Sequence, residues 1–260
     1  MSKNTIYICM SGCEGTGKST QTDKLVQYLK SKNYSVLQTK EPGTPLLPVT
    51  IKLRALMLDS MYQDNIKLLH SEINDILRGP DLLTKNSINL LTSILQKEEQ
   101  EISIHTREYL SQAIRSIHLE KLIFYELQNG NYDYIIQDRG ILSSLAYGFA
   151  CGNDLGTLKE LTQLVTLRTT MKEVYTLYNL VILLQGDTKR NLQRAIGSKQ
   201  EFKNGDIIEL RANKSEGNVF METVNSKMLE LSKNFNTKII NVDDKDVETV
   251  FGEIRDIVEN

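Results

Sequence analysis

Eight residues near the start of the chain have the types and spacing of a loop that binds phosphate groups. They read GCEGTGKS and fit G-x-x-x-x-G-K-[ST] at every fixed position. The glycines let the backbone curl so that consecutive N–H groups point at phosphate oxygens. Lys18 would supply a charge to the β- and γ-phosphates, and the Ser19 hydroxyl would ligate Mg²⁺. We therefore predict a nucleoside triphosphate site formed by Gly12, Cys13, Glu14, Gly15, Thr16, Gly17, Lys18, Ser19 and Thr20.

The pair Asp138 and Arg139 offers a second place for phosphate chemistry. It ends an apolar run, and open parallel α/β sheets bind ligands at the carboxyl ends of their strands. Asp138 could hold the Mg²⁺ shell together with Ser19, or orient groups around an acceptor phosphate. Arg139 offers a fork of donors to a phosphate. The plainer alternative is an ion pair at the start of a helix. If the chain transfers phosphate, this turn must face the phosphate loop.

The elements that position these residues follow from the hydrophobic pattern. Short runs that are apolar throughout alternate with long amphipathic segments, which is typical of a parallel sheet covered on both faces. The predicted fold is α/β: a three-layer α/β/α P-loop NTPase domain, 1–260, with a five-stranded parallel sheet and a helical insertion. We expect strands at 5–10, 34–39, 132–137, 179–185 and 237–242. We expect helices at 18–31, 49–58, 104–127, 142–150, 157–177 and 247–258.

The segment 60–103 differs from its surroundings. It carries two apolar stripes at helical spacing, separated by Gly79-Pro80, and no catalytic motif. We predict an α-hairpin inserted into the domain for a structural or interface purpose.

The net charge, the lengths of the apolar runs and the number of cysteines exclude several classes of protein. The formal net charge of −2 does not provide a broadly basic surface for nucleic acid. The apolar stretch among the first residues is too short for a signal peptide, and no apolar run reaches the length of a membrane span. Three cysteines without metal-ligand spacing are typical of reduced thiols in the cytosol. We expect a cytoplasmic protein with no nucleic acid or membrane partner.

A phosphate loop is shared by switches, motors and kinases. A guanine-specific switch needs N-K-x-D after a strand, together with D-x-x-G. The nearest match, NKSE at 213–216, has Glu in place of Asp and lies in a polar stretch, and no D-x-x-G follows an expected strand. The sequence therefore argues against a switch.

Four motifs, in order along the chain, resemble those of the thymidylate kinase family. They are SGCEGTGKSTQ at 11–21, KEPGTPL at 40–46, REYLSQAIRSIH at 107–118 and DRGILSSLAYG at 138–148. The last helices and strand, at 220–233 and 239–254, look similar too. The resemblance spans nearly the whole chain except 60–103. It implies ATP-dependent, Mg²⁺-dependent phosphorylation of a deoxynucleoside monophosphate, with dTMP to dTDP as the first expectation.

The resemblance also implies how the acceptor is bound. Arg139 would grip the monophosphate, and Tyr147 would lie against the deoxyribose. Glu14 stands where the family has Asp, near the sugar. Lys40 replaces the usual Arg of the acceptor loop and cannot reproduce its bidentate clamp. The substrate-binding residues implied in this way are Glu14, Lys40, Glu41, Pro42, Ser111, Arg115, Asp138, Arg139, Ser144 and Tyr147.

The base-reading helix departs from the family pattern. Arg115 matches an Arg that hydrogen-bonds the base, but Ser111, one turn earlier, replaces a Phe that stacks on thymine. Stacking of this kind is worth about 1–3 kcal/mol in nucleic-acid sites. A kinase with broad or modified-base specificity, of a viral type acting in the host cytoplasm, is therefore the alternative.

The resemblance also implies a mobile lid, at about 197–216, whose cations close over the phosphates. The candidates are Arg190, Arg194, Lys199 and Arg211, and Arg194 fits the L-x-R spacing best. We therefore expect Lys18, Arg139 and Arg194 to be the catalytic residues. Because the lid motif is degenerate, a nucleotide-binding protein with little or no transfer activity is a further alternative. A homodimer through the Arg115 helix, as in the family, stays open as well.

Overall fold

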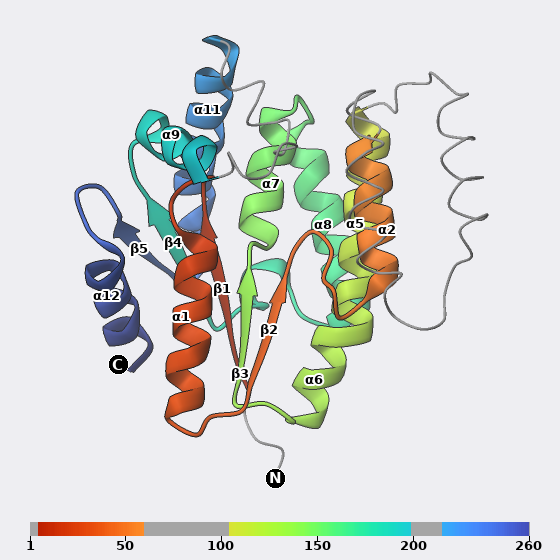
Figure 1. Ribbon diagram of the computed structural model, residues 1–260. Helices are drawn as coiled ribbons and strands as arrows, with labels where there is room; N and C mark the ends of the chain where they lie inside the picture. Colours follow the sequence, from red (N-terminus) through yellow and green to blue (C-terminus); the bar gives the residue numbers. More distant parts are fainter. Residues whose placement is uncertain (1–4, 60–103, 199–214, 260) are drawn as a thin grey trace, which may run out of the picture.

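The computed structural model describes residues 5–59, 104–198 and 215–259. In this part of the chain, five strands form one sheet with the order β2-β3-β1-β4-β5, and every neighbouring pair is parallel. The strands are β1 (Ile6–Gly12), β2 (Val36–Lys40), β3 (Tyr134–Asp138), β4 (Leu180–Gln185) and β5 (Thr237–Asn241). The predicted three-layer fold is confirmed. Figure 1 shows the arrows of β1, β2 and β3 pointing to the same end of the molecule.

One face of the sheet is covered by α1 (Lys18–Ser31) and α12 (Val247–Glu259). Alternate residues of β1, Ile8 and Met10, turn to this face and share a hydrophobic cluster with residues such as Leu25 and Ile254. Both helices therefore bury one apolar stripe against the sheet, as helices that cover a parallel sheet do.

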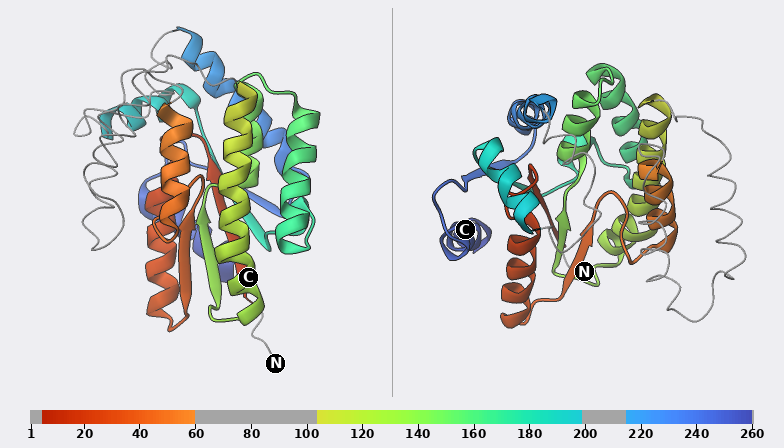
Figure 2. Two further views of the ribbon diagram at one scale, coloured as in Figure 1. Left: turned by 90° about the vertical axis from the view of Figure 1, so that its right-hand side faces the viewer. Right: turned by 45° about the horizontal axis from the view of Figure 1, so that its top comes forward.

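The opposite face carries the longer run of helices. They are α5 (Ile104–His118), α6 (Phe124–Asn129), α7 (Ile141–Ala150), α8 (Leu155–Thr170) and α11 (Ser215–Ser232). Tyr7 and Cys9 of β1 face this side and belong to its core. In the left view of Figure 2, α5 and α8 lie in front of the sheet with α2 (Pro48–Asp59) beside α5. The 3₁₀ helix η2 (Val174–Thr176) precedes β4, and α9 (Thr188–Ser198) follows it.

Two predicted helices end differently from expectation. The helix expected over 104–127 is α-helical only to His118, continues as the π-helix η1 (Leu119–Ile123), and ends with α6. Gly130 closes it in the left-handed conformation. The helix expected over 157–177 ends at Thr170, because Met171 takes a positive φ of 59°. Apolar periodicity continues through both places, so it does not reveal these breaks.

Two predictions lie outside the described residues. They are the helical insertion at 60–103 and, apart from its first and last two residues, the lid at 197–216. Within the described residues, no helix combines the length and apolarity that a membrane crossing needs.

Candidate active site at the carboxyl edge of the sheet

The phosphate loop joins β1 to α1 at the carboxyl edge of the sheet. Gly12, Gly15 and Gly17 have φ values of 145°, 75° and 85°, which residues with a Cβ rarely adopt. A Cβ at Gly15 would lie 1.7 Å from the carbonyl oxygen of Asn191 in α9, whereas a Cβ at Gly17 would meet nothing within 4 Å. The loop therefore rests on α9 on one side and is open at the N-terminus of α1, where the helix dipole favours an anion.

Lys18 folds back over this loop. Its side-chain Nζ donates to the carbonyl oxygen of Cys13 at 2.6 Å, and the Thr16 hydroxyl donates to the same oxygen at 2.8 Å. Burial raises the pKa of the Cys13 thiol to about 11, although Lys18 and Arg139 oppose the rise. Cys13 is therefore a structural thiol, and Lys18 supplies the positive charge of the loop.

The phosphate loop and the Asp138-Arg139 turn meet directly. The Ser19 hydroxyl donates to Oδ2 of Asp138 at 2.7 Å, across the neighbouring strands β1 and β3. The other carboxylate oxygen, Oδ1, is buried and has no hydrogen-bond partner among the described residues. Mg²⁺ prefers oxygen donors of this kind and usually binds few protein ligands, since phosphates and water complete its shell. Ser19 and Asp138 therefore fit a Mg²⁺ site.

A metal site built from several protein side chains is not found in the described ranges. No group of three or more His, Cys, Asp or Glu side chains there could hold a metal ion. The oxygen pair of Ser19 and Asp138 therefore remains the place where a phosphate-bound Mg²⁺ could be received.

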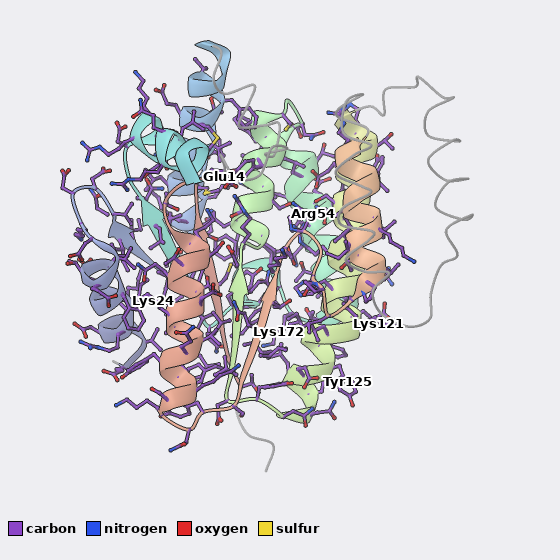
Figure 3. All side chains as sticks on the ribbon, viewed as in Figure 1. Glu14, Lys24, Arg54, Lys121, Tyr125 and Lys172 are labelled. Carbon is purple, nitrogen blue, oxygen red and sulfur yellow. The ribbon has the colours of Figure 1, made fainter. Side chains whose placement is uncertain are left out.

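Arg139 faces the phosphate loop from a constrained turn. Its φ of 64° is unusual for a residue with a side chain, and its N–H donates to the carbonyl oxygen of Met10 at 2.8 Å. The guanidinium pairs with Glu14 of the phosphate loop and lies 5.2 Å from the centre of the Tyr147 ring. Three of the predicted substrate-binding residues are thus brought together. Figure 3 shows Glu14 at this end of the strands.

The acceptor loop follows β2 on the other side of β3. Lys40 is exposed and in register with Asp138, and the backbone N–H of Glu41 donates to the carbonyl oxygen of Asp138 at 3.0 Å. Arg54 of α2, which the sequence motifs did not predict, lies beside this loop: its Cδ would be 3.3 Å from a Cβ on Gly43. A cation within the first two turns of the helix that follows an acceptor loop is a signal that could have found it.

Glu41 and Arg115, both predicted to touch the substrate, are almost fully buried and bind each other. Nε and Nη2 of Arg115 donate to Oε2 of Glu41 at 3.3 and 3.2 Å, and Nη1 donates to Oε1 of Gln112 at 3.0 Å. His118 lies 3.2 Å from Oε1 of Glu41 and 2.9 Å from the Thr39 hydroxyl. The carboxylate thus joins β2 to α5.

The charges in this group support each other. Burial by itself would raise the pKa of Glu41, but the Arg115 charge and the hydrogen bond to His118 outweigh burial and hold that pKa below its ordinary value. Burial would lower the pKa of Arg115, and Glu41 reverses this effect and raises it. The ion pair is therefore charged in the folded protein.

Two further predicted residues, Ser111 and Ser144, are half-buried on different helices. Ser111 is half-buried on the same stripe of α5 as Arg115. Ser144 is half-buried in the first turn of α7, where its N–H donates to the carbonyl oxygen of Gly140. Its neighbour Ser143 was not predicted, yet its hydroxyl is buried and unpartnered within the described residues. Ser143 is therefore an additional polar group available on α7.

The predicted lid cations are only partly described. Arg194 is exposed on α9, and Arg190 pairs with Asp244 at 2.6 Å. Lys199 and Arg211 lie outside the described residues. The catalytic role of Arg194 stays a prediction.

A parallel α/β sheet, a phosphate loop and an adjoining Asp-Arg turn at one edge define the class: a P-loop phosphotransferase. The model of the family described as "Thymidylate kinase" matches residues 84–254, more than half of the chain. The chain belongs to the thymidylate kinase family, whose members are nucleoside monophosphate kinases.

Individual relatives agree over nearly the whole length. The thymidylate kinase of Thermosipho africanus is 28% identical over 255 residues, which covers 98% of each chain. The probable thymidylate kinase of Thermococcus kodakarensis is 28% identical over 255 residues, covering 98% of this chain and 97% of the relative. The crystal structure of thymidylate kinase from Ehrlichia chaffeensis has a TM-score of 0.58 at 20% identity and covers 99% of each chain, which supports the fold.

Proposed function

We propose that the chain transfers the terminal phosphoryl group of ATP to dTMP and releases dTDP and ADP. The observation that carries this proposal is the 2.7 Å contact between Ser19 and Asp138, because it brings the phosphate loop and the second phosphate-binding turn to one place. Phosphoryl transfer needs little covalent help from protein, and alignment of the two reactants can be worth about 7–11 kcal/mol.

One set of residues binds the donor, ATP, and another set binds the acceptor monophosphate. The backbone N–H groups of the phosphate loop and the Lys18 ammonium bind the β- and γ-phosphates of ATP. Arg139, Lys40 and Arg54 surround the acceptor phosphate, since Arg139 follows Asp138, Lys40 is in register with Asp138 at the end of β2, and Arg54 lies beside Gly43 of the acceptor loop. An anion entering between Glu14 and Arg139 would exchange the ion pair of Arg139 for a phosphate contact.

Ser19 and Asp138 would hold Mg²⁺ through the Ser19 hydroxyl and the Asp138 carboxylate, whose Oδ1 is free to take a ligand. When bound, Mg²⁺ would neutralise charge on the phosphates of ATP. The chain itself supplies the orientation, because the Asp138 carboxylate is positioned by its place at the end of β3.

We also propose that the acceptor's base lies along α5 and α7. Ser111 and Arg115 face it from α5, and Ser144 and Tyr147 contact the nucleoside from α7, next to the turn that binds the phosphate. Three N–H groups of Arg115 already donate to Glu41 and Gln112, so the remaining N–H groups are left to reach the base.

A second candidate function is phosphorylation of several deoxynucleoside monophosphates. The observation that favours it is Ser111, a small, half-buried side chain at the position where stacking on thymine is expected. A smaller side chain leaves room for a larger or modified base and gives up stacking energy of about 1–3 kcal/mol.

Three further features belong to the proposal. The chain is one kinase domain in which 60–103 is an insertion and 197–216 a lid whose cations, with Arg194, close over the phosphates. It acts in the cytoplasm, and two copies associate through α5 and its neighbours. Support comes from membership of the thymidylate kinase family, because the resemblance to that family implies the lid and the dimer.

The decisive experiment compares Lys18→Ala with Lys24→Ala. We expect Lys18→Ala to lower kcat by a factor on the order of 10³ or more, because it removes the cation at the transferred phosphate. Lys24 also lies on α1 but pairs with Glu248 on the surface, so its variant controls for the loss of a lysine (Figure 3). Circular dichroism establishes that both variants fold. Near-normal turnover by folded Lys18→Ala would contradict the proposal.

A substrate panel separates the candidate functions. Initial rates with ATP are measured against dTMP and the other deoxynucleoside and ribonucleoside monophosphates. A kcat/KM for dTMP at least tenfold above every other acceptor supports the first function, and similar values for several acceptors support the second. ATP binding without ADP release on any acceptor would reject both and favour a binding protein.

A further inference from the structure

The turn that carries Arg139 is held from inside the protein by a buried amide. The side-chain Nε2 of Gln137 donates to the carbonyl oxygen of Arg139 at 2.8 Å, and the Tyr7 hydroxyl donates to Oε1 of the same Gln137. Gln137 and Tyr7 have no exposed surface. Because Arg139 has a positive φ, its conformation persists only where surrounding contacts hold it. Gln137 supplies such a contact on the carbonyl side.

The next two residues of the turn are held by Tyr178. Gly140 is the N-cap of α7 and has no side chain to bind the first helical N–H groups. Instead, the N–H of Ile141 donates to the Tyr178 hydroxyl oxygen at 3.2 Å. A Cβ on residue 140 would lie 2.4 Å from that oxygen and 2.8 Å from Sγ of Cys9. The tyrosine hydroxyl therefore occupies the place of a capping side chain.

The two contacts belong to one buried unit. The rings of Tyr7 and Tyr178 pack edge to face, with centroids 4.8 Å apart. Burial raises the pKa of both hydroxyls well above the ordinary value, so both stay protonated at neutral pH and keep their hydrogen-bonding roles. We call Tyr7, Gln137 and Tyr178 the turn clamp.

We propose that Gln137 and Tyr178 are positioning residues for the acceptor monophosphate. They act through the backbone of 139–141, which aims the Arg139 guanidinium at the acceptor phosphate and sets the start of α7, the helix that carries Ser144 and Tyr147. None of the clamp residues reaches the substrate, because each is at least 96% buried. The inference rests on the proposed function, since it specifies how that site is kept in shape.

The donor side of the site does not depend on the turn clamp in the same way. The phosphate loop is supported by its own glycine conformations and by α9, through the close approach of Gly15 to Asn191. A loss of the clamp should therefore weaken use of the acceptor and leave use of ATP largely unchanged. A general loss of packing would affect both substrates.

The experiment measures kcat and the KM of each substrate for wild type, Tyr178→Phe and Gln137→Met. Tyr178→Phe removes only the capping hydroxyl, and Gln137→Met removes the amide at similar length. Tyr175→Phe is the matched control, because Tyr175 is three residues away and packs against Phe235 instead of the turn. We expect each clamp variant to lower kcat/KM for dTMP about tenfold, the effect of losing one buried hydrogen bond to the backbone of the turn, with the KM for ATP within twofold of wild type. The control should match wild type.

Two results would overturn the inference. One is a kcat/KM for dTMP within twofold of wild type in both clamp variants. The other is an equal rise in the KM of ATP and the KM of dTMP together with a lower Tm. That result would mean that the clamp only stabilises the fold. If Tyr178→Phe fails to fold, Gln137→Met decides by the same criteria. An inactive wild type would instead reject the proposed function, and this inference with it.

Discussion

At the scale of single residues, the charge pair Glu41–Arg115 has a structural role beside the predicted one. Their predicted contact with the substrate stays a prediction, and in the folded chain the two buried side chains bind each other, with His118 and Thr39 completing the group. Replacing a buried ion pair with apolar residues of similar size often changes the stability of a protein little. Removing only one partner is strongly destabilising, because it leaves an uncompensated buried charge. The group therefore fixes the acceptor loop to α5.

Replacing Glu41 tests this interpretation. Glu41→Gln keeps the shape of the side chain but takes from Arg115 the carboxylate that it is hydrogen-bonded to, so we expect the free energy of unfolding to fall by about 3–5 kcal/mol. Urea unfolding at pH 7 measures the change. Glu248→Gln is the control, because Glu248 forms an exposed pair with Lys24 that should contribute little. Equal stability of the two variants would contradict the interpretation.

The same variant has a pH signature. Because the pKa of Glu41 is lower in the folded than in the unfolded protein, its stabilisation is complete above the unfolded value of about 4.3 and is lost as pH falls through the folded value. Arg115 and His118 from α5, together with Tyr7 and Tyr178, face the carboxylate. The stability difference between wild type and Glu41→Gln should therefore shrink below about pH 4.

At the scale of elements, the phosphate loop is constrained by its neighbour as well as by its own sequence. The glycine pattern predicts the loop, and α1 begins at Lys18 as the apolar spacing indicated. The contact with α9 was not predictable, because it depends on how β4 returns the chain beside β1. Gly15 is needed both for its φ of 75° and for the closeness of Asn191.

Gly15→Ala should therefore impair ATP binding. The new Cβ would overlap the Asn191 carbonyl, so the loop or α9 has to move, and we expect the Kd for ATP to rise at least tenfold. Calorimetric titration measures it. Gly252→Ala is the control: its Cβ would meet nothing within 4 Å on the helix α12, and alanine should raise stability by about 0.5–1 kcal/mol. Unchanged ATP affinity in Gly15→Ala would show that the loop adapts.

The helix boundaries show the limit of periodicity at this scale. All five strands lie within two residues of their predicted bounds. The central strands β1, β3 and β4 are the buried apolar runs, as expected of strands covered on both faces, whereas the edge strands β2 and β5 are partly exposed. The π-helical turn after His118 keeps Leu119 and Ile123 buried, whereas Met171, where α8 ends, is exposed. A repeat of apolar residues does not distinguish these local changes from a regular helix.

At the scale of the whole molecule, the order of the strands decides where the two phosphate sites meet. β1 and β3 are neighbours and parallel, so the phosphate loop and the Asp138 turn leave the sheet at the same edge. The distance between Ser19 and Asp138 is a consequence of this topology, because 119 positions separate them in the chain. Figure 1 shows both turns at the end to which the strand arrows point.

This arrangement predicts simultaneous binding of both substrates. With a non-hydrolysable ATP analogue and dTMP each at about 100 times its Kd, each ligand should stabilise the fold by about 2.7 kcal/mol, and the two effects should at least add. Thermal unfolding with each ligand, then with both, measures this. EDTA should reduce the effect of the analogue, since Ser19 and Asp138 are proposed to hold its Mg²⁺. A shift no larger with both ligands than with one would mean that the sites overlap.

The sequence by itself determined the phosphate loop, the Asp-Arg turn, the parallel sheet and the family resemblance, because each depends on residue types at short, regular spacing. Tertiary structure decided which distant groups lie together: Glu41 with Arg115, Arg54 beside Gly43, and Tyr178 at the start of α7. Buried polar groups have to find partners, and the partner is whichever group the packing of distant elements brings within reach. No local pattern records that choice.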